Sequence, residues 1–182
     1  MDKNEKIIAG LDLSLTHTGF VVLKSNGEVL SRGVIKSKPT GPLPVNEIKR
    51  IVDIVKTIAD NFIQVGDIDL VLIEGLSFMS KGTSLVQLSG LNYLIRKELF
   101  TAGIPFVIVA PTTLKKFITG SGKGEKDQMM MKVYRDYRFE ASDNNENDAF
   151  CLAAVGSALL GVPLSKMLKS QEETLKLLKK QL

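Results

Sequence analysis

The chain has 182 residues, of which 44% are hydrophobic and 24% are charged, with 15 glycines and 6 prolines. This composition excludes a disordered or fibrous protein, and the length predicts one globular domain. The single cysteine, Cys151, excludes an intrachain disulfide, and the apolar runs stay below the roughly 18 residues of a membrane span. We therefore expect a cytoplasmic protein without a membrane segment. Its net charge of +4 and pI near 9.1 are compatible with a polyanionic partner such as nucleic acid.

The first third of the chain predicts three antiparallel strands followed by a helix. Residues 6–13 are apolar on both faces, as expected for a strand inside a covered sheet. Residues 18–25 and 28–36 flank the dipeptide Asn-Gly at 26–27, a strong two-residue hairpin signal. Residues 36–44 are rich in Pro and Gly and predict a loop. The apolar residues that follow have helical spacing and predict one buried helix face: Val45, Ile48, Ile51, Val52, Val55, Ile58 and Phe62.

Strands and helices alternate after Gly66. Apolar runs at 69–75 and 105–111 predict two further strands, separated by a helix over 85–99. More helices are predicted over 112–118, 126–137 and 146–160. Strands joined through helices need crossover connections and lie parallel. The predicted fold class is therefore α/β, with a mixed five-stranded sheet, three antiparallel strands and then parallel strands, flanked by helices.

The C-terminal residues 163–182 predict an amphipathic helical tail attached to a domain of residues 1–162. Leucines recur on one stripe of this segment, and Ser170 with Glu173 could form a capping box at the helix start. We expect the tail to pack on its own domain, with dimerisation and DNA contact as the alternatives.

Three acidic residues stand at the ends of predicted elements. Asp12 ends the first strand, Glu74 ends the strand over 69–75, and Asp148 lies near the start of the last apolar helix. Singly, each has an ordinary interpretation as a turn acid, a lysine partner or a helix-start residue. Together they would repel one another, and a cluster of ionised carboxylates is stable with hard cations such as Mg²⁺ or Mn²⁺. Two such ions about 4 Å apart can support phosphodiester hydrolysis.

Four segments, 10–23, 70–82, 106–133 and 144–159, resemble in their order and approximate spacing the successive motifs of the RuvC family of Holliday-junction resolvases. The resemblance covers roughly residues 6–160 and is greatest to the shorter bacteriophage-type branch. It implies an RNase H-like fold, a homodimer, and an endodeoxyribonuclease with two Mg²⁺ ions per site, for which Mn²⁺ can substitute. It also implies paired nicks in four-way junctions, with forks or flaps as further branched substrates, and host-cell cytoplasm as the location of a phage-encoded member.

The resemblance also implies roles for individual residues. Asp12, Glu74 and Asp148 match the catalytic metal ligands. Lys126, with Lys115 as a second candidate, matches a lysine close to the scissile phosphate, where it would neutralise developing charge. One further implied contact comes from the segment after Glu74. There, Phe78 matches an aromatic residue that inserts against bases at the junction centre.

The fourth ligand is where the sequence departs from the family pattern. Asn145 stands three residues before Asp148, where bacterial members have an acid or a histidine. An asparagine carbonyl can bind a hard cation but carries no formal charge. We therefore place Glu146 first as the additional metal ligand, with Asp143 and Asn145 as alternatives. Asn145 also suggests a second function, a branched-DNA-binding protein with weakened catalysis.

Lysines surround the glycine-rich segment 119–125. Lys115, Lys116 and Lys123, with Lys81 nearer the centre of the chain, are candidate contacts to DNA phosphates. The ordinary alternative is a solvated basic loop.

A different enzyme class remains open, an ATP-binding domain of the actin and sugar-kinase superfamily. Residues 12–19 resemble its phosphate loop. That fold normally needs a second, duplicated domain, for which 182 residues leave little room.

Overall fold

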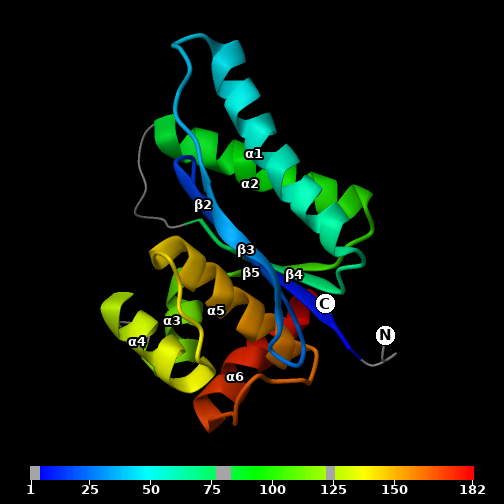
Figure 1. The fold of residues 1–182 in the computed structure, drawn as a ribbon, viewed down its shortest axis with the longest axis vertical. Helices are drawn as coiled ribbons and strands as arrows, with labels where there is room; N and C mark the ends of the chain where they lie inside the picture. The colour runs from blue at the N-terminus through cyan, green and yellow to red at the C-terminus, as the bar shows by residue number, and fades with distance from the viewer. Residues whose placement is uncertain (1–4, 77–82, 122–125) are drawn as a thin grey trace.

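The computed structural model describes residues 5–76, 83–121 and 126–182. It contains one five-stranded sheet with the strand order β3-β2-β1-β4-β5 and helices on both faces (Figure 1). The strands are β1 (Ile7–Asp12), β2 (His17–Lys24), β3 (Val29–Lys36), β4 (Leu70–Glu74) and β5 (Phe106–Val109). The mixed α/β sheet predicted from the sequence is confirmed.

Strand pairing divides the sheet into an antiparallel half and a parallel half. β1 pairs antiparallel with β2 and parallel with β4, while β2 pairs antiparallel with β3 and β4 pairs parallel with β5. The hairpin between β2 and β3 turns at Asn26 and Gly27. Gly27 has a φ of 93°, a region that favours glycine, and the Asn26 side chain accepts a 2.8 Å hydrogen bond from the Glu28 amide. The turn signal in the sequence is thus confirmed.

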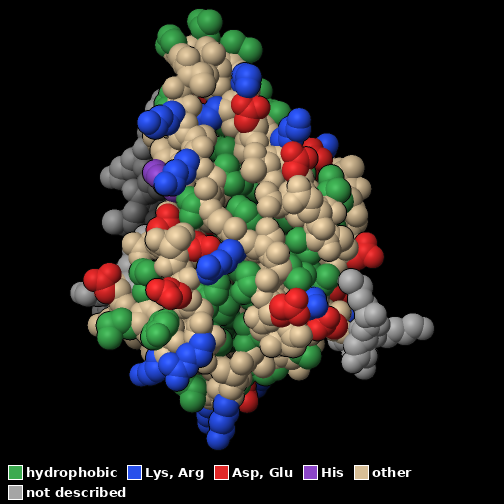
Figure 2. All heavy atoms as spheres, viewed as in Figure 1, with side chains coloured by type: hydrophobic (Ala, Val, Ile, Leu, Met, Phe, Trp, Pro, Cys, Tyr) green, Lys and Arg blue, Asp and Glu red, His purple; other side chains and the backbone are tan. Residues whose placement is uncertain are grey.

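Two long helices, α1 (Pro44–Val65) and α2 (Thr83–Thr101), cover one face of the sheet (Figure 1). Their buried side chains, Ile51, Ile54, Ile58, Phe62, Leu91, Ile95 and Leu99, pack against inward residues of β1, β2 and β4. The predicted buried face of α1 was wrong in its first turns, because Val45, Ile48 and Val52 are 47–66% exposed. The N-terminal part of α1 extends beyond the strand ends, and Figure 2 shows hydrophobic side chains at this projecting end.

The opposite face is covered by α3 (Pro111–Thr119), α4 (Lys126–Tyr137), α5 (Asn144–Leu159) and α6 (Lys169–Leu178), followed by a short 3₁₀ helix, η1 (Lys179–Gln181). α5 is buried along nearly its whole length and lies against β1, β2 and β4. A Cβ atom at Gly10 would lie 2.0 Å from the carbonyl oxygen of Ala149, so this close approach requires glycine. Among the described helices, none is long and apolar enough to span a membrane.

The C-terminal segment packs on the same domain. Leu175 and Leu178 join the core under α5, and the Gln171 side chain donates a 2.9 Å hydrogen bond to the carbonyl of Phe117. The Gln181 side-chain oxygen accepts a 3.0 Å hydrogen bond from the Ile108 N–H, and its nitrogen donates a 2.9 Å hydrogen bond to the Ile108 carbonyl. These bonds satisfy backbone groups on the outer edge of β5.

The division of the chain at residue 162 stays a prediction, but the predicted capping box in this segment is wrong. Ser170 and Glu173 do not cap α6, because this helix begins two residues earlier than that pattern requires. The Gln171 side chain instead accepts a 2.8 Å hydrogen bond from the Leu168 amide.

Candidate active site

Asp12 and Glu74 lie side by side at the carboxyl ends of two parallel strands. Leu11 of β1 is in register with Ile73 of β4, so the next residue of each strand reaches the same edge of the sheet. Leu11 and Ile73 face α1 and α2, and side chains alternate along a strand. Asp12 and Glu74 therefore point to the opposite face, where α5 lies. Asp12 is only 8% exposed.

Asp148 is brought to the same region by α5. Gly19, the register partner of Asp12 on β2, lies so close to the first turn of α5 that an added Cβ would be 2.1 Å from the carbonyl oxygen of Asn145. Asp148 follows within one turn of that contact. Burial raises the pKa of the Cys151 thiol well above its usual value, and the negative charges of Asp148 and Glu74 add to this rise. Both carboxylates thus lie near the same buried thiol of α5.

The three acids make interactions within the chain but do not form a ready-made metal site. Asp12, Glu74 and Asp148 each have an interaction partner. Within residues 5–76, 83–121 and 126–182, no group of three or more His, Cys, Asp or Glu side chains could hold a metal ion in this conformation. The arrangement gathers carboxylates at one sheet edge and leaves part of a cation's ligand shell to be supplied by other groups.

The N-terminus of α5 is capped by acidic residues that the sequence analysis considered as ligands. The Asp143 side chain accepts hydrogen bonds of 2.9 Å from the backbone amides of Asn145 and Glu146. Glu146 is buried, accepts a hydrogen bond from the Ser142 amide, and lies 3.6 Å from the Nε of Arg32. Both carboxylates thus have hydrogen-bond partners near the N-terminus of α5.

Asn145 lies on the same face of α5 as Asp148. Residues three apart on a helix share a face, so Asn145 and Asp148 project to the same side of α5. The Asn145 side-chain amide donates a 3.4 Å hydrogen bond to a carboxylate oxygen of Asp143. Assignment of the fourth ligand among Glu146, Asp143 and Asn145 stays a prediction.

Arg32 is a residue of this region that sequence reasoning missed. From β3 it donates a 2.8 Å hydrogen bond to the Glu140 carbonyl, and its guanidinium lies 5.2 Å from the centroid of the Phe139 ring. With its ion pair to Glu146, it ties the loop before α5 to the sheet. Its partners are more than 100 residues away in sequence, since Arg32 and Glu140 are separated by 108 positions, so no local pattern could have indicated them.

A family model described as crossover junction endodeoxyribonuclease RuvC matches residues 8–156, most of the chain and all of the region just described. The chain belongs to the RuvC family. A RuvC of Rhodopirellula baltica is 27% identical over 167 residues, covering 88% of this chain and 91% of its own. One from Orientia tsutsugamushi is 30% identical over 158 residues, with coverage of 83% and 94%.

Solved structures agree on the fold. RuvC of Thermus thermophilus matches with a TM-score of 0.70 at 19% identity, covering 89% of this chain and 99% of that one. The same protein in complex with a Holliday junction substrate matches with a TM-score of 0.66 at 20% identity, with coverage of 90% and 99%. The predicted RNase H-like, RuvC-type fold is thus confirmed, and family membership sets aside the ATP-binding alternative.

The basic residues expected in a RuvC protein are only partly within the described structure. Lys115 and Lys116 lie on α3, which begins two residues after β5 and so starts beside the edge that carries Glu74. Lys116 is exposed and Lys115 half-buried. Lys126 is the first residue of α4, but its side chain lies outside the described part, as do Phe78, Lys81 and Lys123. The DNA-contact roles of these residues stay predictions.

Proposed function

We propose that this RuvC-family chain is a structure-selective DNA endonuclease that resolves Holliday junctions and related branched DNA by paired nicks. The observation that carries the proposal is the register of β1 with β4, which sets Asp12 and Glu74 side by side on the face covered by α5. Together with Asp148, these residues lie within the range 8–156 that the family model matches. Family membership supports the class of reaction, and the acidic residues at the strand ends are the ones proposed to carry it out.

The reaction is proposed to depend on Mg²⁺, with Mn²⁺ as a substitute and two ions per site. Carboxylate oxygens are ligands that hard cations prefer, so the donor set of Asp12, Glu74 and Asp148 fits. Mg²⁺ usually binds through one or two carboxylates and completes its shell with water and substrate phosphates. An incomplete protein ligand set among the described residues is compatible with this mode, with the DNA phosphate as the remaining ligand. When bound, such ions activate a water molecule and stabilise the leaving oxygen.

The residues of the chain have distinct proposed tasks in this reaction. Asp12 and Asp148 would hold one ion and Asp12 and Glu74 the other. The strand backbone and the close contact of Gly19 with Asn145 keep these acids in place. Lys126 would sit near the scissile phosphate and neutralise charge as it develops there. The near-complete burial of Asp12 limits water around its carboxylate, which strengthens electrostatic interactions at the site.

We also propose a homodimer that uses the outer face of α2. Val86, Tyr93 and Phe100 follow one another at intervals of seven residues, which places them on one face of the helix, and they are 65–81% exposed. A row of large apolar side chains of this kind is typical of an association surface. Two-fold symmetry would present two active sites to a pseudo-symmetric junction, as paired nicks require.

Substitution on two helices tests the dimer. Tyr93→Asp is expected to yield monomers in light scattering coupled to size exclusion. Tyr134→Asp alters an exposed tyrosine on α4, which covers the opposite face of the sheet, and is expected to leave the dimer intact. Dimers of Tyr93→Asp, or monomers of Tyr134→Asp, would contradict the α2 interface.

Cleavage of labelled DNA tests the proposed function. Four-way junctions, forks and linear duplex are incubated with the protein in Mg²⁺, Mn²⁺ or EDTA. Asp12→Asn is expected to abolish paired nicking and retain junction binding. Asp69→Asn is the matched control, because Asp69 lies beside the opposite end of β4 and pairs there with Lys6 at 2.8 Å. Tight junction binding by the wild-type chain without cutting in either metal would favour the second candidate, a junction binder with weakened catalysis at Asn145.

The bacteriophage-type branch and a location in the host-cell cytoplasm complete the proposal. The segment Asn-Asn-Glu-Asn-Asp-Ala at 144–149 supports the phage-type assignment, while the curated relatives named above are bacterial.

A further inference from the structure

Arg50 of α1 holds the connection that follows Asp12. Its Nη2 donates to the carbonyl of Leu15 and, at 3.3 Å, to the carbonyl of Ser37, while its Nε donates to the Ser37 hydroxyl at 2.9 Å. The Ser37 hydroxyl also donates to the Leu15 carbonyl, and the Ser37 amide donates to Thr16 at 3.1 Å. One guanidinium thereby joins α1, the β1–β2 connection and the residue after β3.

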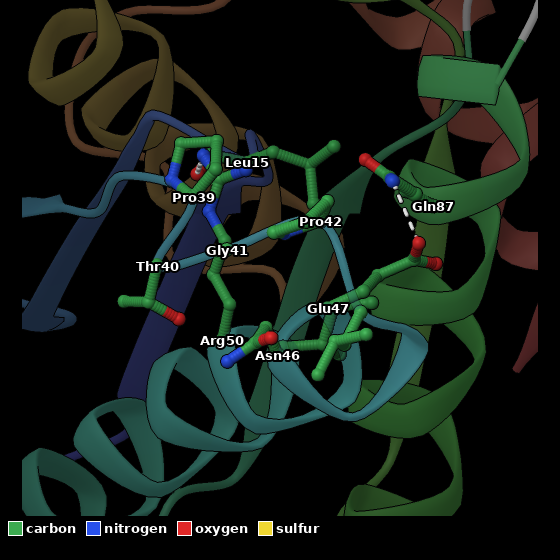
Figure 3. A pocket seen from close by; sticks show the side chains of 11 residues that line it. Leu15, Pro39, Thr40, Gly41, Pro42, Asn46, Glu47, Arg50 and Gln87 are labelled. Atoms are coloured by element: carbon green, nitrogen blue, oxygen red, sulfur yellow. Dashed lines mark hydrogen bonds between the residues drawn. The ribbon is translucent and has the colours of Figure 1, made fainter.

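Glu47, one turn earlier on α1, contacts α2, the helix that comes after β4 in the chain. Its carboxylate accepts a 2.8 Å hydrogen bond from the Gln87 side chain in the second turn of α2, drawn as the dashed line in Figure 3. Residues three apart share a helix face, so Glu47 and Arg50 act from the same side of α1. The same short stretch of α1 thus contacts both the connection after Asp12 and the second turn of α2.

These contacts surround a pocket rather than a closely packed core. The pocket has a volume of about 170 Å³ and is lined by Leu15, Gln87, Glu47, Arg50 and the loop before α1 (Figure 3). Leu15 and Leu88 also pack against the apolar cluster below α1 and α2. Hydrogen bonds from α1 add to this packing in setting where the backbone at Leu15 and the first turns of α2 lie.

We propose that Arg50 and Glu47 are positioning residues that set the relative placement of Asp12 and Glu74. This inference rests on the proposed metal-dependent cleavage. Arg50 fixes the backbone three residues after Asp12, and Glu47 anchors the helix entered after Glu74. A guanidinium suits this task because its planar fork can serve several acceptors at fixed angles, which an ammonium group cannot. Displacement of either segment would alter the spacing between the carboxylates that share the cations.

Variants of Arg50 test the inference in the full-length protein on a four-way junction. Arg50→Lys keeps the positive charge but loses the planar guanidinium with its several donors, and Arg50→Gln removes the charge. Since misplacement by about 1 Å can reduce a rate about 100-fold, we expect kcat to fall by about 10- to 100-fold in both variants. The junction Kd should stay within about 3-fold, and the Mg²⁺ concentration that gives half the maximal rate should rise. Gln87→Leu should shift the Mg²⁺ requirement in the same direction.

Asn61→Ala is the matched control on the same helix. Asn61 accepts a 3.2 Å hydrogen bond from Ser31 of β3, so its loss also weakens the contact of α1 with the sheet, but far from the acids. It should lower the unfolding temperature while leaving kcat and the Mg²⁺ requirement unchanged.

The outcomes separate this inference from the proposed function. Normal cleavage by the wild-type chain, combined with a wild-type kcat and Mg²⁺ requirement in folded Arg50→Lys, overturns the positioning role alone. Equal losses of kcat in Asn61→Ala and in the Arg50 variants would show a general effect of stability on activity and would also overturn the positioning role. Absence of cleavage by the wild-type chain overturns the proposed function and this inference with it. A raised Mg²⁺ requirement confined to the Arg50 and Gln87 variants supports it.

Discussion

Replacement of Gly19 by alanine should impair cleavage far more than it impairs folding. An added Cβ would lie 2.1 Å from the carbonyl oxygen and 2.4 Å from the carbonyl carbon of Asn145, both backbone atoms in the first turn of α5. Because ordinary contacts begin near 3.4 Å, α5 must move by more than 1 Å relative to β2. That movement would carry Asp148 away from Asp12, the register partner of Gly19.

The size of both effects follows from this displacement. Overpacking of this kind typically lowers the free energy of unfolding by about 1–3 kcal/mol, and a displacement of about 1 Å at reacting groups can reduce the rate about 100-fold. In a chain of this length, each kcal/mol corresponds to a fall of roughly 2–4 °C in the unfolding temperature. We therefore expect Gly19→Ala to remain folded at 25 °C and to cut junctions about 100-fold more slowly.

The assay is single-turnover cleavage of a labelled junction, with urea unfolding measured in parallel. Gly33→Ala on β3 is the matched control, because its Cβ would meet only the ring of Phe20 at 3.2 Å, and a side chain can yield. This control should cut at close to the wild-type rate. Wild-type cleavage and stability in Gly19→Ala would refute the argument that this contact places Asp148.

Two predictions concern stability. Within the described part of the chain, Asn92 is 1% exposed and neither its side-chain nitrogen nor its oxygen has a hydrogen-bond partner. In urea unfolding, Asn92→Leu should leave the free energy of unfolding unchanged or raise it by about 1 kcal/mol at most, because no hydrogen bond is lost. A large decrease in that free energy would show that Asn92 has a hydrogen-bond partner. Asp136 has a pKa lowered to about 2 by hydrogen bonds from Arg135 and Lys132. Its stabilising contribution should be present above its unfolded pKa near 3.8 and be lost as pH falls towards 2; as a surface pair it should amount to less than about 1 kcal/mol. Asp136→Asn compared with the wild type by urea unfolding at pH 7 and pH 2 tests this, and an equal difference at both values would contradict it.

Local signals in the sequence determined the strands and helices and placed Asp12 and Glu74 at strand ends. The Asn-Gly hairpin follows from the backbone freedom of glycine, and the strands before Asp12 and Glu74 follow from runs that are apolar on both faces. The alternation of strands and helices after Gly66 required parallel pairing, and so the two acids could be expected at one edge. These inferences succeed because turn chemistry and hydrophobic periodicity act within a few residues.

Tertiary structure alone decided the rest, because it depends on contacts between distant parts of the chain. The apolar stripe of α1 predicts burial throughout, yet Val45 and Ile48 are more than half exposed in the N-terminal part of this helix, which extends beyond the strand ends. Glu146 on α5 pairs with Arg32 of β3, a contact that no local pattern indicates. Arg50 reaches a carbonyl 35 residues away. A sequence pattern records which side chains can bury or bind, whereas the packing of helices on the sheet determines which partners they meet.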